Sequence, residues 1–203
     1  MQMSFPGGNG NARVPRRILH LGEPQLRRKA ERVDPNDIPC AEIQRVIDDL
    51  ITTMRDAGGA GLAATQIGET VRICVIEVDN NPRYPYKPPI PLTVLVNPTW
   101  VGLTEERFVN NEGCLSVPGL RGDVARLTQI RVNALDRNGA EIDLTVRGLS
   151  AGTYQHECDH LDGMLFIDKL EDPASLSTWE NFERYRRDEY LGRVAELVGR
   201  YGQ

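Results

Sequence analysis

The sequence predicts one α+β domain, in which short mixed or antiparallel sheets pack around a central helix, with an amphipathic helix near the N-terminus and a helix at the C-terminus. Its 203 residues are close to the size of a single domain. Apolar residues recur at helical spacing in a few separate segments, and short β-branched runs lie between them. Short strands beside a few separate helices are typical of the α+β class.

The first helix is predicted over Ala41–Asp56. Its apolar residues follow one another in steps of three and one, which places them on one face of a helix. They are Ile43, Val46, Ile47, Leu50, Ile51 and Met54. Two glycines at 58–59 end the pattern. We expect this face to belong to the hydrophobic core rather than to a binding surface.

Strand signals follow the first helix. Val71–Val78 and Leu92–Asn97 are short and rich in β-branched residues. Between them, Asn80–Pro91 has five prolines and two tyrosines, so we expect a surface loop that either rims a binding site or only connects two strands. Residues 129–146 alternate apolar and polar residues on either side of Asn138-Gly139, which predicts a hairpin.

Two further helices are predicted after the hairpin. Ser150–Leu161 is followed by Gly163, a common helix end. Ser177–Glu180 has the spacing of a capping box, which would open the C-terminal helix. We therefore divide the chain into a flexible tail (residues 1–15), one domain that carries the chemistry (16–175) and a C-terminal helix (176–203).

Composition and charge exclude several classes of protein. Hydrophobic residues make up 40% and charged residues 26%, unlike a disordered, collagen-like or disulfide-rich chain. The net charge is −5 (24 − 29), so no direct DNA binding is expected. No apolar run approaches the ~20 residues of a membrane span, and no apolar leader is present, so we expect a cytoplasmic protein without a membrane partner. A signal that directs the protein to an organelle stays open, because the N-terminal segment contains Arg13, Arg16 and Arg17 and no acidic residue.

An H-E-x-x-H motif stands inside the second predicted helix. His156 and His160 lie one turn apart on the same helical face, so both imidazoles reach one ion, and Glu157 reaches a water on it. Two unrelated histidines on a surface helix would give the same pattern. A catalytic site needs a third ligand, which the residues alone do not select. Phe166 stands where metzincin proteases have a histidine, and four acidic residues are available further on: Glu171, Asp172, Glu180 and Glu183.

The four cysteines divide into two groups. Cys40 lies near the start of the first helix, Cys74 has apolar neighbours, and Cys158 lies about 200° around the helix from His156, so we expect these three to be buried and inert. Glycines and a proline flank Cys114. Such an irregular loop presents either a reactive thiolate or a plain buried thiol.

A glycine-rich segment, Gly58–Gly68, follows the first helix. Three of its first four residues are glycines, so its backbone can approach another chain closely. It is neither a P-loop nor a dinucleotide fingerprint, because it lacks Gly-Lys-Ser/Thr and because strand and helix fall in the wrong order. Gln66 is the polar side chain expected to direct a hydrogen bond inward; otherwise the segment is a tight turn with small packing residues.

Three segments in this order resemble the peptide deformylase family: Gly59–Gln66 (G-x-G-L-A-A-x-Q), Glu112–Ser116 (E-G-C-L-S) and Gln155–Gly163 (Q-H-E-x-D-H-L-x-G). The resemblance extends over about Arg17–Leu170. It implies hydrolytic removal of the formyl group from the N-terminal formyl-methionine of nascent polypeptides, with release of formate. Formyl-methionyl nascent peptides are the implied partners. Docking to the ribosome stays open, because the charge-balanced C-terminal helix offers no basic patch.

The resemblance also implies the metal centre. Cys114 joins His156 and His160 as a ligand of one divalent ion, Fe²⁺ in the cell, with Zn²⁺, Ni²⁺ or Co²⁺ as alternatives. The ion lowers the pKa of its water toward ~7. Glu157 then acts first as general base and afterwards as general acid.

Contacts with the substrate follow from the same resemblance. The backbone N–H of Leu115 and the side-chain amide of Gln66 would stabilise the charge that grows on the formyl oxygen. Arg121 would lie near the later residues of the peptide, or else be a plain surface arginine. The remaining implied contacts are Ala60, Gly61, Gly113 and, lining the methionine pocket, Leu149.

Two positions depart from the family pattern. Many members have apolar residues where this chain has Asn110 and Gly152, which leads to the hypothesis of a wider or more polar pocket mouth. Two other functions stay open on the residues alone. An H-E-x-x-H zinc endopeptidase would not need Cys114, and a catalytically silent metal-binding module would need four closed protein ligands.

Overall fold

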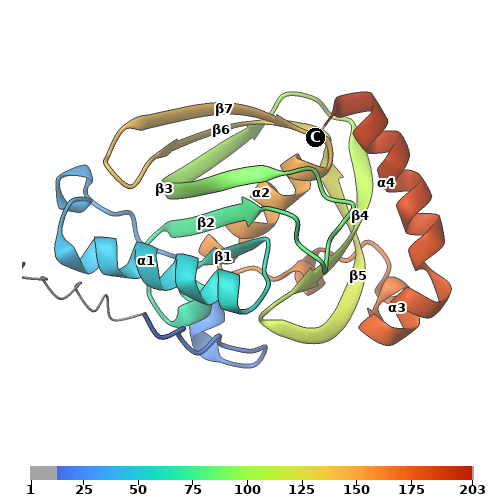
Figure 1. The fold of residues 1–203 in the computed structure, drawn as a ribbon, viewed down its shortest axis with the longest axis horizontal. Coiled ribbons are helices and arrows are strands. Elements are labelled where there is room, and N and C mark those ends of the chain that lie inside the picture. The colour runs from blue at the N-terminus through green and yellow to red at the C-terminus, as the bar shows by residue number, and fades with distance from the viewer. Residues whose placement is uncertain (1–12, 203) are drawn as a thin grey trace, which may run out of the picture.

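The computed structural model describes residues 13–202. It contains two antiparallel sheets, with helix α2 (Gly148–Leu161) behind the larger one and helices α3 and α4 together at one side (Figure 1). Helix α1 (Ala41–Asp56) packs against strands β1 and β2. Of the flexible tail expected at residues 1–15, positions 1–12 lie outside the described residues.

The larger sheet has five strands in the order β1-β2-β3-β6-β7, and the smaller has three in the order β4-β5-β8. The strands of the larger sheet are β1 (Gly61–Ala63), β2 (Ile73–Val78), β3 (Ile90–Gly102), β6 (Gln129–Leu135) and β7 (Glu141–Arg147). Those of the smaller sheet are β4 (Arg107–Cys114), β5 (Val117–Leu127) and β8 (Ser177–Thr178). All pairings between these eight strands are antiparallel, and the one parallel contact in the described residues is an isolated bridge between Glu31 and Val71.

The remaining elements are helical. Two α-helices follow α2, namely α3 (Trp179–Tyr185) and α4 (Arg187–Tyr201). Short 3-10 turns occupy Pro24–Arg27, Pro35–Asp37, Ala64–Ile67, Phe166–Lys169 and Pro173–Ser175. Within the part of the chain that the structure describes, no helix has the length and apolar character needed to cross a membrane.

The predictions for α1 and for the hairpin are confirmed. Helix α1 has the predicted bounds, and its six periodic apolar residues are all buried in one core cluster. The hairpin β6–β7 closes through a three-residue loop, because Asp136 and Ala140 are joined by a backbone hydrogen bond of 2.8 Å. Gly139 has φ +84°, the left-handed conformation that such a loop requires.

Strand β3 is longer than predicted. Its first half pairs with β2 and its second half with β6, and the register shifts between Val96 and Thr99. Asn97 has φ +56° at this irregularity, and its side chain bonds both backbone groups of Val33. Pro98 therefore stands at the register shift, where no ladder hydrogen bond is needed. The sequence pattern alone, by contrast, indicates that the strand ends at this proline.

The C-terminal helix departs from the prediction. Instead of one helix over 176–203, α3 and α4 are separated at Arg186, whose backbone leaves the helical conformation. The cap is Thr178 rather than Ser177: the Thr178 hydroxyl accepts from the Asn181 N–H at 3.2 Å. Ser177 is instead paired with Arg121 in the smaller sheet.

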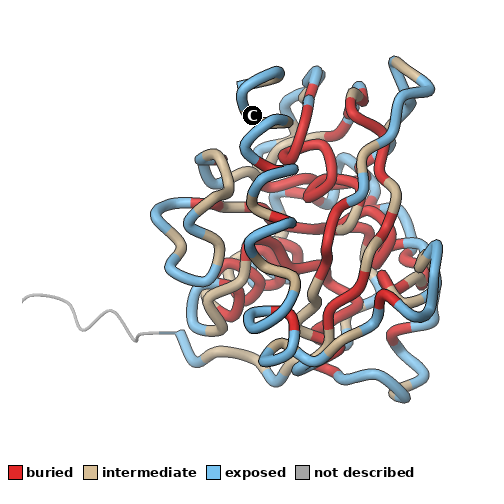
Figure 2. The backbone as a smooth tube through the Cα atoms, turned by 90° about the vertical axis from the view of Figure 1, so that its right-hand side faces the viewer, coloured by how far each residue is buried: buried red, intermediate tan, exposed pale blue. Residues whose placement is uncertain are grey.

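Helix α2 lies in the interior of the protein. Every residue of α2 is buried except His156, which is partly exposed. The helix contacts strands of both sheets as well as α4, and Figure 2 shows buried segments running through the middle of the molecule beneath an exposed outer layer. Such all-round burial explains why α2 shows no single apolar face. The helix begins at Gly148, two residues before its predicted start.

Cys74 and Cys158 are buried, as predicted, and burial raises the pKa of the Cys158 thiol to about 12. The prediction is wrong for Cys40, which is only partly buried at the residue preceding α1. A position just before a helix faces the solvent on one side, so a place near the start of α1 does not by itself bury the thiol.

Candidate metal centre and substrate pocket

Three sequence-predicted ligands converge on one point. Cys114 Sγ lies 3.3 Å from His160 Nε2, which lies 3.2 Å from His156 Nε2. The three ligand atoms all lie within 4.8 Å of one another. The two histidines come from successive turns of α2, and Cys114 ends β4 at the tight turn into β5, where it pairs with Val117.

The geometry fits a metal ion. Tetrahedral coordination with metal–nitrogen bonds of about 2.0–2.1 Å and a metal–sulfur bond of about 2.3 Å separates neighbouring ligand atoms by about 3.3–3.7 Å. The two observed separations, 3.2 and 3.3 Å, are close to this range. One thiolate and two imidazoles suit Fe²⁺, Zn²⁺, Co²⁺ and Ni²⁺, and three protein ligands leave a coordination position open.

A buried ionic network orients His156. Glu112 Oε2 lies 2.8 Å from His156 Nδ1, which directs Nε2 toward the cluster. Both oxygens of Glu112 accept from Arg126, at 2.7 and 2.8 Å, and Arg126 also donates to Asp159 at 2.6 Å. Burial alone would raise the pKa of Glu112, but the charge and hydrogen bonds of Arg126 hold that pKa well below its usual range.

Arg126 was not predicted from the sequence, although its position on a strand indicates it. Arg126 and Val124 are two residues apart on β5, so they lie on the same face, and Val124 is in the core. A charged residue on an apolar strand face requires a buried partner. The partners Glu112 and Asp159 come from β4 and α2, and sequence spacing does not relate them to it.

Glu157 lies beside the cluster with one oxygen free for chemistry. Its side chain is buried, and Oε2 has no hydrogen-bond partner within residues 13–202. Burial raises the pKa of Glu157 to about 7. The carboxyl packs against Gly61, where an added Cβ would lie only 2.7 Å from Glu157 Cγ. A glycine at position 61 is therefore what allows β1 to approach the carboxyl group.

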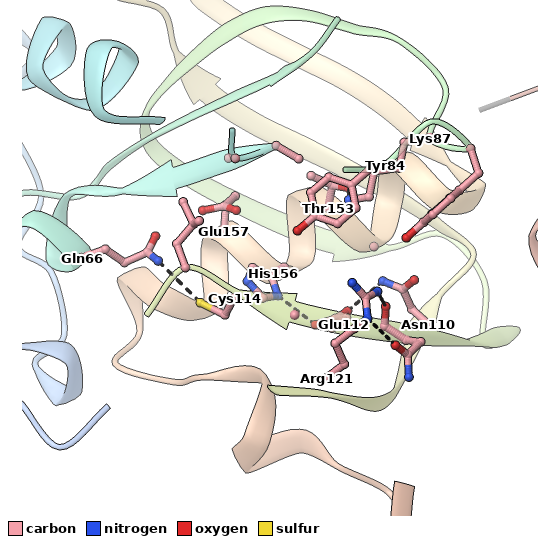
Figure 3. A pocket seen from close by; sticks show the side chains of 18 residues that line it. Gln66, Tyr84, Lys87, Asn110, Glu112, Cys114, Arg121, Thr153, His156 and Glu157 are labelled. Carbon is pink, nitrogen blue, oxygen red and sulfur yellow. Dashed lines mark hydrogen bonds and ion pairs between the residues drawn. The ribbon is translucent and has the colours of Figure 1, made fainter. Parts of the chain in front are cut away.

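Gln66 presents its amide nitrogen to the cluster. Its Oε1 accepts from the Ala63 N–H at 2.8 Å, which fixes the orientation of the amide. Its Nε2 donates to Ser116 Oγ at 3.1 Å and lies 3.6 Å from Cys114 Sγ (Figure 3). The prediction that Gln66 directs a hydrogen bond inward is therefore supported by the geometry.

A pocket opens at the metal-binding cluster (Figure 3). Ala60, Gly61 and Gly113, which the family resemblance implied as substrate contacts, all line it. The proline-rich loop between β2 and β3 contributes Tyr84 and Lys87, together with a second tyrosine, Tyr86. Of the two interpretations of this loop, rim and plain connection, the structure supports the rim.

Arg121 is not a surface arginine. Only 1% of it is exposed, and it lines the pocket. Its Nε and Nη2 donate to the side chain and backbone carbonyl of Asn111, both at 2.7 Å. The guanidinium lies over the rings of Trp179 and Phe182, 4.6 and 4.5 Å from their centroids. Helix α3, for which the sequence indicated no role, thus holds Arg121 in place.

Leu149 lies elsewhere than expected. It is buried beside Phe182, Tyr190 and Val194, where it borders a separate apolar cavity under α4 rather than the pocket at the metal-binding cluster. Asn110 stands between the two spaces and accepts a 2.9 Å hydrogen bond from the Tyr190 hydroxyl. Tyr190 on α4 thereby holds Asn110, which borders both spaces.

Comparison with known proteins identifies the family. The family model for polypeptide deformylases matches residues 15–175. The chain belongs to the peptide deformylase family. Peptide deformylase 1 of Nitrosomonas europaea is 44% identical over 155 residues, which is 76% of this chain and 87% of that protein.

Solved deformylase structures agree with this assignment. A class I type b peptide deformylase from Acinetobacter baumannii with bound Met-Ala-Ser has a TM-score of 0.74 and 33% identity, covering 77% of this chain and 99% of that one. A peptide deformylase from Synechococcus elongatus in complex with actinonin has a TM-score of 0.69 and 31% identity, covering 94% and 88%. The α+β prediction is confirmed, and neither the endopeptidase nor the silent metal-binding module receives support.

Proposed function

We propose that the chain hydrolyses the formyl group from the N-terminal formyl-methionine of nascent peptides and releases formate. One observation carries this proposal: a cluster of one thiol and two imidazoles lies beside the buried carboxyl of Glu157, whose Oε2 has no partner among the described residues, in a pocket bordered by the edge strand β1. Membership of the peptide deformylase family supports it independently.

Cys114, His156 and His160 would hold one divalent metal ion, Fe²⁺ in the cell. When bound, the ion lowers the pKa of a coordinated water and polarises the formyl carbonyl. Glu112 keeps His156 in the orientation that presents Nε2, and Arg126 keeps Glu112 ionised.

Glu157 moves the proton. With a pKa of about 7, it is poised to accept a proton from water near neutral pH and to pass it to the leaving amine. Its burial excludes competing solvent, and the contact with Gly61 limits where the carboxyl can lie. These two features give the acid–base group both a suitable pKa and a defined position.

The formyl oxygen would be stabilised by Gln66 Nε2 and by the backbone N–H of Leu115. The bond between Gln66 Oε1 and the Ala63 N–H supports this assignment, because it holds the donating end of the amide toward the cluster before substrate arrives. A preorganised donor of this kind typically contributes about 3 kcal/mol of barrier reduction.

The peptide would lie along β1. Strand β1 is the edge of its sheet and pairs only with β2 in the described residues, so its other side is available to an extended peptide. Ala60 and Gly61 would pair with the peptide backbone on that side, and Gly113 would contact it from the opposite wall. The Met-Ala-Ser tripeptide bound to the Acinetobacter relative supports a peptide ligand of this length.

The catalytic unit would span residues 16–175 and depend on the C-terminal helices. The family match ends at residue 175, but Phe182 and Trp179 hold Arg121, and Tyr190 holds Asn110 in the pocket wall. Helices α3 and α4 therefore complete the pocket rather than extend from it.

The test is formate release from formyl-Met-Ala-Ser by protein loaded anaerobically with Fe²⁺ or Ni²⁺. We expect hydrolysis that Glu157→Gln abolishes at unchanged metal content, whereas Glu141→Gln, on the exposed face of β7, has no effect. Cys114→Ala is expected to remove both metal and activity. Cleavage of an internal peptide bond, or activity that survives Cys114→Ala, would contradict the proposal.

A further inference from the structure

A lysine ammonium lies inside the pocket, one helical turn from the metal-binding cluster. Lys87 Nζ, from the proline-rich loop, donates a 2.9 Å hydrogen bond to Thr153 Oγ1 on α2 (Figure 3). Thr153 precedes His156 by three residues, which is about 4.5 Å along the helix axis. With the formyl group at the cluster, the end of the first side chain of a peptide would therefore reach the region of Nζ.

The contacts of Lys87 do not use its full hydrogen-bonding capacity. An ammonium group has three donors, and Thr153 accepts one of them. The ring of Tyr84 lies beneath Nζ, with 5.1 Å between Nζ and the ring centroid. Burial lowers the pKa of Lys87 to about 8, so the group is still mainly charged at neutral pH.

A second cation in the same pocket has an unused donor. Arg121 is 1% exposed, and its Nη1 has no hydrogen-bond partner in the described part of the chain. This nitrogen lies 3.6 Å from the place where a Cβ on Gly113 would stand, and Gly113 borders the same pocket. Asn111 and two aromatic rings hold the guanidinium, so Nη1 is kept in position without a ligand.

The nearby carboxylates do not balance these charges. Glu112 is already engaged by Arg126 and His156. Within residues 13–202, no hydrogen bond or ion pair joins Glu157 to Lys87 or Arg121. Cations that line a pocket and keep unused donors favour a ligand that brings a negative charge and several acceptor atoms.

We propose that Lys87, in a pocket whose positive charge Arg121 increases, forms a subsite for a first side chain that ends in a carboxylate, so that formyl-glutamyl peptides are substrates beside formyl-methionyl ones. The inference rests on the proposed deformylase function and names a substrate class for the same site. Glutamate and methionine both have two methylene groups before their terminal group, so they reach equally far. The thioether sulfur is only a weak acceptor, whereas a carboxylate accepts a charge-assisted hydrogen bond from an ammonium group.

The test compares kcat/KM for formate release from formyl-Glu-Ala-Ser, formyl-Gln-Ala-Ser and formyl-Met-Ala-Ser. We expect Lys87→Met to lower the ratio of the Glu to the Met peptide by about tenfold or more, because a charge-assisted hydrogen bond is lost. Lys29→Met, which removes an exposed lysine, is expected to leave that ratio unchanged. The Gln peptide has the shape of Glu without its charge, so it separates charge recognition from hydrogen bonding.

A glutamyl-to-methionyl ratio that Lys87→Met leaves unchanged would overturn the inference while the proposed function stands. If no formyl peptide is hydrolysed by metal-loaded protein, the proposed function fails, and the subsite is then judged by calorimetric binding of the unformylated peptides. Glu-Ala-Ser should bind more tightly than Met-Ala-Ser, and this preference should be lost in Lys87→Met. Equal binding of the two peptides by the unchanged chain would also overturn the inference.

Discussion

Replacing Gly61 by alanine would push a methyl group into the side chain of Glu157. A Cβ built at position 61 lies 2.7 Å from Glu157 Cγ and closer still to its carboxyl group, whereas ordinary contact begins near 3.4 Å. Cγ must therefore retreat by about 0.7 Å (3.4 − 2.7), and the carboxyl group by more. A misplacement of about 1 Å lowers catalysis about 10²-fold, so we expect kcat/KM for formyl-Met-Ala-Ser to fall about 100-fold.

The assay measures formate release and metal content on the same preparations. Metal content should not change, because Gly61 does not contact the three ligands, and overpacking should lower the free energy of unfolding by about 1–3 kcal/mol. Gly192→Ala is the matched control: nothing lies within 4 Å of its added Cβ on the exposed side of α4. Full activity in Gly61→Ala, or an equal loss in Gly192→Ala, would refute the argument that Gly61 positions Glu157.

Three further predictions concern the surroundings of the site. Glu112→Gln should weaken Zn²⁺ binding by about 10–100-fold, measured by competition with a chromophoric chelator, because His156 loses its charged partner; unchanged affinity would contradict this role. Glu157→Gln should raise the free energy of unfolding of metal-free protein by on the order of 3 kcal/mol at pH 8 and by under about 1 kcal/mol at pH 5. The reason is that the pKa of about 7 in the folded protein exceeds the ordinary 4.5, so stability is lost as the pH rises between these values; equal gains at both pH values in urea titrations would argue against it. Tyr190→Phe should lower the free energy of unfolding by about 1 kcal/mol through the lost hydroxyl bond, whereas Tyr185→Phe, at a 69% exposed residue, should not.

Local patterns predicted local structure well. The spacing of apolar residues located α1 at both ends, and Asn138-Gly139 located the turn of the β6–β7 hairpin, because both depend on residues within a few positions of one another. Predictions failed where distant packing overrode a local signal. Asn97-Pro98 indicates the end of a strand, yet β3 continues because two different strands pair with its two halves.

The candidate site shows the same division. Residues alone indicated His156, His160 and Glu157 but left the third ligand open. The family resemblance supplied Cys114 as that ligand and gave Gln66 its role toward the formyl oxygen. Neither source located the Arg126 network. The resemblance placed Leu149 in the pocket, but in this chain Leu149 packs beside Phe182 and Tyr190 and borders the separate cavity under α4.

The sequence by itself determined that His156 and His160 point the same way from their helix, because residues four apart on any α-helix share one face. The apolar stripe of α1 and the closing turn of the β6–β7 hairpin were likewise determined by residues close together in the sequence. Only the tertiary structure decided that Arg121 is buried and that Lys87 enters the pocket, because each depends on elements far apart in the sequence: α3 packs on Arg121, and the proline-rich loop folds over α2. The charge of the pocket is a sum over those elements, so no local pattern in the chain contains it.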